Sequence, residues 1–394
     1  MSELEKIQSI RAEFPAVQSM SYLNTGTCGP LPVRTVEAMQ QALQKELHGG
    51  RASIPGYISF FDRMEDFRAQ LASWVGATPD EVLMTHHTTE GMNIVLWGLD
   101  WQQGDEIITT THEHQGLLAP LAMLHQQFGV QVRYIEINGD VEHDTRALSA
   151  AINKRTRLIA MSHVDYMYGT IFPLEALAEV ANQQDIPMLI DGAQSVGVFD
   201  VDVKALGVPF YAFPGQKWLC GPEGTGGLYV DADWISRVQP TFSGIFSIRD
   251  VAWFDQTSPY IVPAIGARRY QHGGYFRPIV EGFSTSLSYL DELGRSWIFS
   301  RIKTLAQRAY DAISNISHVR LHTEQDLFGS LLTFSIDGLD GKEISAMVEK
   351  HQVEIRYVPL PNGASYARAS FGFYNDEGDV ERLVKALEQC HPTT

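Results

Sequence analysis

The fold of this protein is decided by the stretch MLIDGAQS, residues 188–195. Its three leading apolar residues have the length of a short buried strand, and they run directly into Asp191. Comparable runs recur along the chain. The predicted strands are 82–85, 107–111, 130–137, 157–161 and 188–190, and the predicted helices between them are 88–99, 117–128 and 174–184. Strands that alternate with helices are typical of an α/β fold, in which a mainly parallel sheet is covered by helices on both faces.

This alternation ends near residue 230. Residues 232–280 are rich in glycine and aromatic residues and predict a loop-rich segment. The elements predicted beyond it are helices at 278–293 and 299–316, a strand at 331–336 and a helix at 343–351. We therefore expect a second, smaller α+β domain at about 285–394.

The composition describes an acidic globular protein. The chain has 394 residues, 44% of them hydrophobic, and a formal net charge of −17. This acidity argues against nucleic-acid or membrane-surface partners, because both need clustered Lys and Arg. No window approaches the roughly 18 apolar residues of a membrane span. The three cysteines, Cys28, Cys220 and Cys390, form no C-x-x-C pair, and together these features predict a soluble, cytoplasmic protein.

Polar residues follow several of the predicted strands. In an open parallel sheet, ligands bind beyond the carboxyl ends of the strands, so side chains at those ends are candidates for one shared site. These residues are Thr88, Thr89, His112, His114, Ser162, His163, Asp191 and Lys217. The sequence predicts that they converge on one crevice.

Asp191 and Lys217 suggest a specific cofactor. The aspartate either caps a helix or addresses a cationic ligand atom, and the lysine is either solvated or buried between Phe213 and Trp218. A buried lysine that forms a Schiff base, and a carboxylate that keeps a pyridine nitrogen protonated, are what pyridoxal 5'-phosphate (PLP) needs. The segment 87–91, with Thr88 and Thr89, offers backbone N–H groups and hydroxyls to a phosphate at a helix N-terminus, or caps that helix.

Further motifs extend this pattern over most of the chain. They are YLNTG at 22–26, GPLP at 29–32, TTEG at 88–91, EH at 113–114, DGAQS at 191–195, KWLCGP at 217–222 and RAS at 368–370. In this order and spacing they resemble the fold-type I, class V PLP enzymes. That family includes cysteine desulfurases, cysteine/cystine C–S lyases and isopenicillin N epimerase-like proteins. The resemblance implies a mainly parallel, seven-stranded-type sheet sandwiched by helices, the cofactor PLP and a homodimer.

The resemblance also implies a division of the chain into three parts. Residues 1–20 would form an N-terminal segment that packs near the small domain. Residues 21–284 would form the large PLP-binding domain, and residues 285–394 the small C-terminal domain.

Roles for individual residues follow from the same resemblance. His114 would stack on the cofactor ring and assist proton transfer, beside catalytic Lys217 and Asp191. The other implied cofactor contacts are Thr88, Thr89, Gln194, which would bond the ring hydroxyl oxygen, Gln216 and Gly274. The implied substrate contacts are Arg368, which would clamp a carboxylate, Arg356, Gly26 and Tyr166. Arg356 is alternatively an exposed arginine in a salt bridge.

A metal site is the rival interpretation of His112-Glu113-His114, whose two imidazoles have the i, i+2 spacing of two ligands. A metal needs a third protein ligand, and it leaves Lys217 and Asp191 unexplained. We therefore expect no metal.

Three positions depart from the family's pattern. Gln216 stands where histidine is usual, Pro214 where a phosphate-binding Ser or Thr is common, and Tyr166 where asparagine is usual. These changes predict altered contacts to the cofactor, with Gln216 contributing a hydrogen bond through its side-chain amide.

The absence of a cysteine from one segment distinguishes between two reactions of this family. Desulfurases that form a protein persulfide need a mobile cysteine shortly before the carboxylate-binding arginine, and none lies between Arg356 and Arg368. Cys28, in the N-terminal loop, is either a reactive thiol or buried and inert. The segment 80–107 is especially similar to the C–S lyases. The resemblance therefore implies α,β-elimination from cysteine, cystine or a related amino acid, giving pyruvate, ammonia and a sulfur product.

Two alternatives stay open at this point. One is an aminotransferase or epimerase acting on a larger amino acid, with residues 270–276 shaping the pocket. The other is a catalytically silent cofactor-binding protein, suggested by Pro214 and Gln216. A nicotinamide dehydrogenase is excluded, because the glycines at 221–227 precede a predicted strand and do not open a helix.

Overall fold

A computed structural model describes residues 2–249, 262–360 and 363–392 of the chain. Part of the predicted loop-rich segment, residues 250–261, lies outside the described residues. The described remainder of that segment contains two short 3-10 helices, at Ile245–Ser247 and Gly266–Tyr270, and the first turn of the helix Arg277–Leu293, so it is loop-rich up to residue 276 where it is described.

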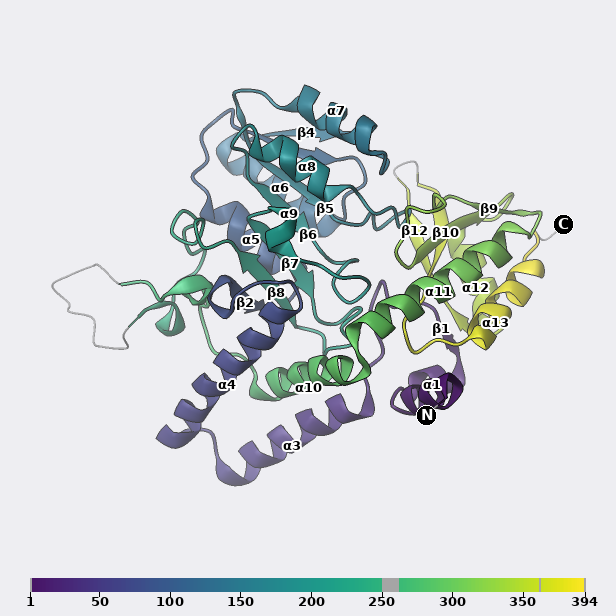
Figure 1. Ribbon diagram of the computed structural model, residues 1–394, viewed down its shortest axis with the longest axis horizontal. Coiled ribbons are helices and arrows are strands. Elements are labelled where there is room, and N and C mark those ends of the chain that lie inside the picture. Colours follow the sequence, from purple (N-terminus) through teal and green to yellow (C-terminus); the bar gives the residue numbers. More distant parts are fainter. Residues whose placement is uncertain (1, 250–261, 361–362, 393–394) are drawn as a thin grey trace.

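A seven-stranded sheet forms the centre of the larger part of the molecule (Figure 1). In spatial order it contains β2 (Val82–Thr85), β8 (Gly226–Val230), β7 (Phe210–Pro214), β6 (Met188–Asp191), β5 (Thr156–Ser162), β3 (Glu106–Thr110) and β4 (Gln131–Ile135). All neighbouring pairs are parallel except the two that involve β8, which is antiparallel to β2 and to β7. The predicted, mainly parallel sheet is thus confirmed.

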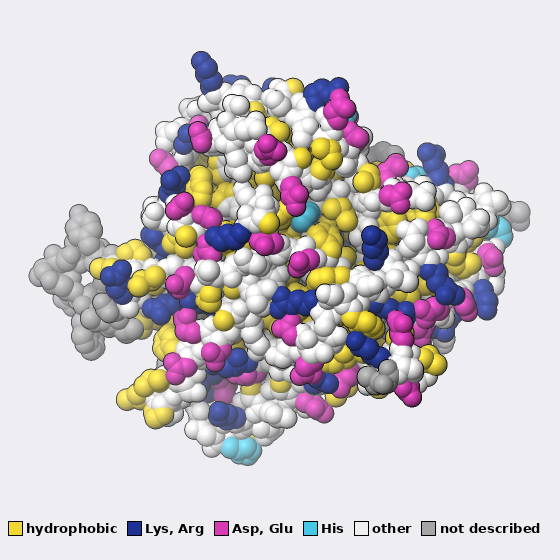
Figure 2. All heavy atoms as spheres, in the orientation of Figure 1, with side chains coloured by type: hydrophobic (Ala, Val, Ile, Leu, Met, Phe, Trp, Pro, Cys, Tyr) yellow, Lys and Arg dark blue, Asp and Glu magenta, His cyan; other side chains and the backbone are white. Residues whose placement is uncertain are grey.

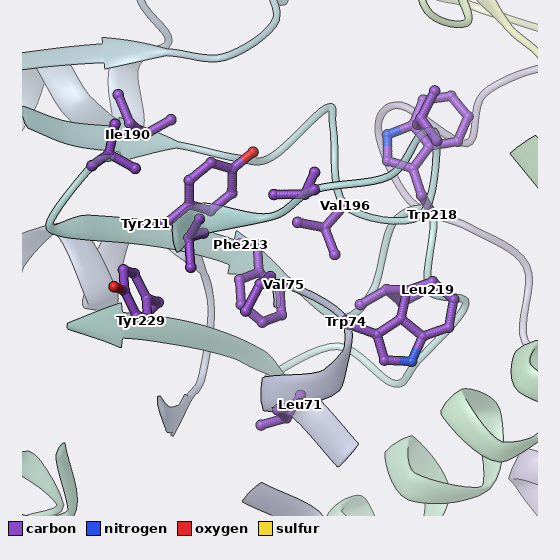
Figure 3. Close-up of a cluster of buried hydrophobic side chains, with 14 of the residues drawn as sticks. Leu71, Trp74, Val75, Ile190, Val196, Tyr211, Phe213, Trp218, Leu219 and Tyr229 are labelled. Carbon is purple, nitrogen blue, oxygen red and sulfur yellow. The ribbon is translucent and has the colours of Figure 1, made fainter. Parts of the chain in front are cut away.

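Successive residues of each strand point to opposite faces of the sheet, and a separate hydrophobic cluster packs on each face. On β6, Leu189 belongs to the cluster with Leu121 of α6, whereas Ile190 belongs to the cluster with Leu177 of α8. Figure 3 shows the second of these clusters, where Tyr211 and Phe213 of β7 lie near Ile190. The helices that follow these strands are α5 (Thr88–Gly98), α6 (Gln115–Phe128), α7 (Val141–Ala151), α8 (Leu174–Asn182) and α9 (Val203–Leu206).

Four longer helices surround this unit and lead out of it. They are α3 (Val33–Gly49), α4 (Ile54–Ser73), α10 (Arg277–Leu293) and α11 (Arg295–Ser314). In Figure 1, α3 and α10 run side by side beneath the sheet, and they are joined by a buried hydrogen bond of 2.6 Å between Thr35 and Ser286. Among the described residues, no helix is long and apolar enough to cross a membrane.

A separate four-stranded antiparallel sheet lies towards the C-terminus. Its spatial order is β12 (Arg356–Pro359), β13 (Ser365–Ser370), β10 (Leu331–Ile336) and β9 (Val319–Leu321). It packs with α11, α12 (Gly341–Glu349) and α13 (Glu377–Glu388) around its own hydrophobic cluster. This arrangement is the smaller α+β unit expected from the sequence.

The N-terminal segment contacts this smaller unit. It contains α1 (Glu3–Ala12) and α2 (Ala16–Ser19), and Arg11 lies 2.8 Å from the carboxylate of Asp379 on α13. The next strand, β1 (Ser21–Tyr22), pairs with β11 (Val353–Glu354). The predicted boundary between residues 284 and 285 falls inside α10, and the domain limits remain a prediction.

Candidate active site

A cavity of about 260 Å³ lies at the carboxyl ends of β5, β6 and β7. The parallel strands bring their last residues to one edge, as the strand-end argument requires. Its lining residues are Thr27, His87, Thr88, Thr89, His114, Ser162, Val164, Tyr166, Asp191, Ala193, Gln194, Gln216, Lys217 and Arg356. Nine of the twelve residues predicted from the sequence are therefore brought together here.

The other three predicted residues lie in different places. Gly26 and Arg368 are adjacent to the lining, because Gly26 accepts a hydrogen bond from Gln194 and Arg368 donates one to Tyr166. Gly274 is not near the cavity of its own chain. It borders a separate hollow with Phe246 and Phe276.

Asp191, the last residue of β6, is buried, and Lys217, on the loop after β7, is partly buried; both line the cavity. Burial lowers the pKa of the lysine to about 8, and only part of that loss is offset by the neighbouring aspartate. Burial also raises the pKa of Asp191, against the opposing effects of Lys217 and a hydrogen bond of 2.9 Å from the Ala193 N–H. The lysine is thus available as a neutral amine near neutral pH, which is the form that attacks a carbonyl or accepts a proton.

Two arginines face each other across a strand pair at the mouth of this site. Arg356 of β12 is the direct partner of Arg368 of β13 in the antiparallel register. Arg368 is 1% exposed, and its Nη1 donates to the Tyr166 carbonyl at 2.5 Å, while Nε and Nη2 are buried without a partner. Burial and the charge of Arg356 lower its pKa to about 9. A buried guanidinium that has two unpaired donors and lies opposite a second cation favours a bound anion, and a carboxylate fits a guanidinium best.

His114 and Tyr166 form one wall of the cavity. Their rings meet edge to face, with centroids 5.0 Å apart at 89°. His114 caps α6, and its Nδ1 accepts from the Gly116 N–H at 3.0 Å, so the neutral ring carries its proton on Nε2. Burial and the cations Lys217 and Arg356 lower its pKa to about 4. The imidazole is therefore neutral, which suits stacking on an aromatic ring.

The three residues of the metal hypothesis diverge in the structure. His112 pairs with Asp165 at 3.1 Å, and Glu113 turns into a buried cage where the hydroxyls of Ser162 and Thr110 donate to it at 2.6 and 2.7 Å. His114 alone lines the cavity. Within the described ranges, no group of three or more His, Cys, Asp or Glu side chains is placed to hold a metal ion.

Gln194 ties three distant segments together. Its amide N–H donates to the Gly26 carbonyl at 2.9 Å, and its amide oxygen accepts from the indole N–H of Trp218 at 3.0 Å. One N–H therefore remains for a ligand in the cavity. A Cβ at Gly26 would lie 2.7 Å from Leu331 and 3.3 Å from Arg368, so a side chain there would disturb the arginine.

None of the described cysteines lines the cavity. Cys28 is half-buried, donates to the Gln216 carbonyl at 3.4 Å and has its pKa raised, chiefly by burial. Cys220 and Cys390 are buried. The inert interpretation of Cys28 thus fits its surroundings better than that of a reactive thiol.

Five lining residues were absent from the predicted site residues: Thr27, His87, Ser162, Val164 and Ala193. The Thr27 hydroxyl accepts a hydrogen bond of 3.4 Å from Arg356, and no local sequence pattern indicated that contact. His87 is the N-cap of α5, where its Nδ1 accepts from the Glu90 N–H at 3.1 Å. Its position in the sequence, directly before Thr88 and Thr89, could have indicated that it lines the cavity.

The chain resembles known proteins over almost its whole length. The family model described as aminotransferase class-V matches residues 21–383. A probable cysteine desulfurase of Methanothermobacter thermautotrophicus is 25% identical over 98% of each chain. The cysteine desulfurase of Haloferax volcanii is 28% identical over 97% of this chain and 96% of the relative.

Solved structures of the same family superpose closely. The cystine C–S lyase C-DES, in complex with its reaction product cysteine persulfide, has a TM-score of 0.90 and 28% identity, covering 96% of this chain and all of the other. A C-DES mutant with glycine covalently linked to its PLP cofactor has a TM-score of 0.90 and 27% identity, covering 96% and 99%. These matches and the motif order lead to one conclusion: the chain belongs to the aminotransferase class-V family.

Proposed function

We propose that this protein is a PLP-dependent C–S lyase. It would act by α,β-elimination on cysteine, cystine or a related S-substituted amino acid, and it would release pyruvate, ammonia and a sulfur product. The observation that carries the proposal is a cavity lined by Lys217, Asp191 and Arg356, with Arg368 adjacent and no described cysteine in its lining. The likeness to desulfurases and to a cystine C–S lyase supports the same reaction class.

The residues around the cavity fit PLP. Its phosphate matches the N-terminus of α5, where the backbone N–H groups and the hydroxyls of Thr88 and Thr89 offer donors on the cavity lining. Asp191 would hold a proton on the pyridine nitrogen, and His114 would cover the ring. When bound, PLP withdraws electrons from the substrate's α-carbon, which makes loss of the α-proton and of a β-sulfur group feasible.

The chain's own residues would position the substrate and move its protons. The unpaired Nε and Nη2 of Arg368 would bind the α-carboxylate, which fixes the α-carbon above Lys217. The lysine Nζ, whose neutral fraction is increased because burial lowers its pKa to about 8, would take the α-proton. Neutral His114 would donate from Nε2 towards the departing sulfur.

A substrate with two carboxylates fits this site particularly well. Arg356 stands directly across from Arg368, and like charges in that position repel unless anions separate them. Cystine carries one carboxylate for each arginine, and cleavage of its Cβ–S bond releases the other half of the molecule as a persulfide. We therefore place cystine before cysteine among the candidate substrates. The alternative of an aminotransferase or epimerase gains no support from Gly274, which lies outside the cavity of its own chain.

We also propose that the working protein is a homodimer, in which Gly274 reaches the site of the second copy. Large apolar side chains are exposed near the α3–α4 connection, including Leu47 at 72%, Ile54 at 76% and Ile58 at 58%. Figure 2 shows such side chains in yellow at the lower left of the molecule. They flank the hollow that Gly274 and Phe276 border. A contiguous exposed apolar surface of this kind marks an interface.

We propose a cytoplasmic location and a division of the chain into three parts. Three free cysteines support a reducing, cytoplasmic compartment. The division at 1–20, 21–284 and 285–394 is supported by the separate clusters around the two larger sheets.

The cofactor claim is tested by a visible spectrum of purified protein incubated with PLP, before and after borohydride. We expect a visible band that borohydride removes, with the cofactor then attached covalently at Lys217. The Lys217→Ala protein should lack the covalent product. A wild-type protein that acquires no such band, although PLP is in excess, would contradict the proposal.

A further inference from the structure

The cofactor's phosphate end lacks one side-chain donor in this chain. Pro214, the last residue of β7, offers neither a hydroxyl nor a backbone N–H, yet it leads into Gln216 and Lys217 on the cavity wall. A phosphate dianion needs several donors. Another side chain must therefore supplement the N-terminus of α5 and its two threonines.

His87 is placed to supply that donor. It lines the cavity directly before Thr88, as the N-cap residue of an eleven-residue helix. Its backbone is extended, with φ −172° and ψ 169°, so the side chain folds over the start of the helix and borders the same space as the two threonines. A second observation points to a polar ligand in that space: the side-chain amide of Gln216, on the same lining, has a buried oxygen with no partner, and rotation of the amide by 180° would turn its N–H donors to the same place.

The cap fixes which nitrogen of His87 can donate. Its Nδ1 accepts a hydrogen bond from the Glu90 N–H at 3.1 Å, and an accepting nitrogen carries no proton. The neutral ring therefore carries its proton on Nε2. The imidazole thus caps the helix with one nitrogen and offers an N–H donor with the other.

The nearest acidic side chain does not oppose an anion here. Glu90 is in the first turn of α5, but its carboxylate is held by the backbone N–H of His86 and lies 2.8 Å from the His86 Nδ1. Its charge is therefore engaged by a neighbouring histidine.

We propose that the His87 Nε2–H donates a hydrogen bond to the phosphate of the bound cofactor and takes the place of the hydroxyl missing at Pro214. This inference rests on the proposed function, since it assigns a ligand to the phosphate of PLP. It makes His87 a cofactor-binding residue in addition to a helix cap.

The test compares two cofactor forms that differ only in the phosphate. The dissociation constants of PLP and of pyridoxal are measured by absorbance on wild type and on His87→Ser, which keeps a good N-cap and removes the imidazole donor. We expect PLP affinity to fall at least about tenfold, as for loss of one hydrogen bond to a charged group, while pyridoxal affinity is unchanged. His87→Asp keeps the cap and adds a negative charge, so its loss of PLP affinity should be larger.

A matched control is His86→Gln, at the neighbouring histidine, which does not line the cavity and whose replacement keeps a side-chain donor for Glu90. Its ratio of PLP to pyridoxal affinity should equal that of wild type. Equal losses for both forms in His87→Ser, or no loss for either, would overturn the phosphate contact and leave His87 as a cap only. Failure of wild type to bind PLP at all would instead contradict the proposed function.

Discussion

At the residue scale, the chemistry depends on a lysine whose amine is partly neutral. Lys217 is partly buried next to Asp191, and burial is the largest effect on its pKa, which falls to about 8 from the ordinary 10.5. Asp191 acts in the opposite direction and raises the pKa of Lys217. The pair therefore sets the pH range in which the free amine can react.

The pH dependence of cofactor loading follows from this pair. For protein freed of cofactor, the rate of covalent PLP capture should rise about tenfold per pH unit below about 8 and level off above it, because only the neutral amine attacks. Stopped-flow absorbance measures this rate. In Asp191→Asn the inflection should move to lower pH, since the charge that raises the lysine's pKa is gone. An inflection near 10.5 in wild type would show an ordinary, solvated lysine.

The arginine pair gives a second prediction at this scale. Arg356→Gln should lower kcat/KM for cystine about tenfold or more, because one carboxylate loses a charged hydrogen-bond donor. The value for cysteine, which has a single carboxylate, should change little. Pyruvate release from the two substrates measures both values on the same preparation. Equal losses for both would contradict the role of Arg356 as the second carboxylate contact.

The sequence identifies the side chains that depend on strand ends but misses those that depend on distant contacts. Lys217 and Asp191 were predicted because each follows an apolar run in a parallel sheet, whose ends meet at one edge. The bonds of Gln194 to Gly26 and Trp218 join three separate segments. The hydrogen bond from Arg368 to the Tyr166 carbonyl likewise links the two sheets. No local pattern encodes these contacts.

At the element scale, the loop after β6 is anchored from below by a buried hydrogen-bond chain. The hydroxyl of Tyr211, on β7, lies 2.5 Å from the Ser195 hydroxyl and 2.7 Å from the Nδ1 of His163. All three side chains are buried. Since Asp191 and Gln194 stand on the segment that Ser195 ends, this chain holds the cofactor-facing residues in place.

Removing the hydroxyl at its centre should destabilise the fold. Tyr211→Phe leaves the buried His163 Nδ1 without its partner and removes one of the two partners of the Ser195 hydroxyl, so the free energy of unfolding should fall by about 1–3 kcal/mol. Urea denaturation followed by tryptophan fluorescence measures it. Ser195→Ala removes one end of this hydrogen-bond chain and should lower the free energy of unfolding by less than Tyr211→Phe does. An unchanged denaturation midpoint in Tyr211→Phe would contradict the anchoring role.

Some helices were predicted from the sequence and others were not, and the exposure of their apolar side chains explains the difference. The helices that cover the sheet, such as α5 and α6, bury an apolar face and show helical spacing. In α3 and α4 the apolar residues are divided between buried positions, such as Phe67 and Leu71, and exposed ones, such as Leu47 and Ile58, so the buried face is harder to recognise in the sequence. The antiparallel direction of β8 was likewise not predicted, because alternation and length carry no information on strand direction.

At the scale of the whole molecule, the exposed apolar residues of α3 and α4 stand out against a net charge of −17. If this surface is the dimer interface, Ile58→Asp should give a monomer, since it places a charge in an apolar contact. Analytical ultracentrifugation measures the state. Leu4→Asp, on α1 and 66% exposed, is the matched control and should leave the dimer intact. A wild-type chain that is monomeric at all concentrations would contradict the proposed assembly.

The most direct test of the central claim is the identity of the carbon product when cystine or cysteine is added to the PLP-loaded protein. Elimination leaves pyruvate and ammonia, whereas removal of sulfur by a desulfurase leaves alanine. We predict equimolar pyruvate and ammonia, greatest with cystine, and no product from Lys217→Ala. Substrate consumption that yields alanine, or a reaction that requires an added keto acid, would contradict the assignment as a C–S lyase.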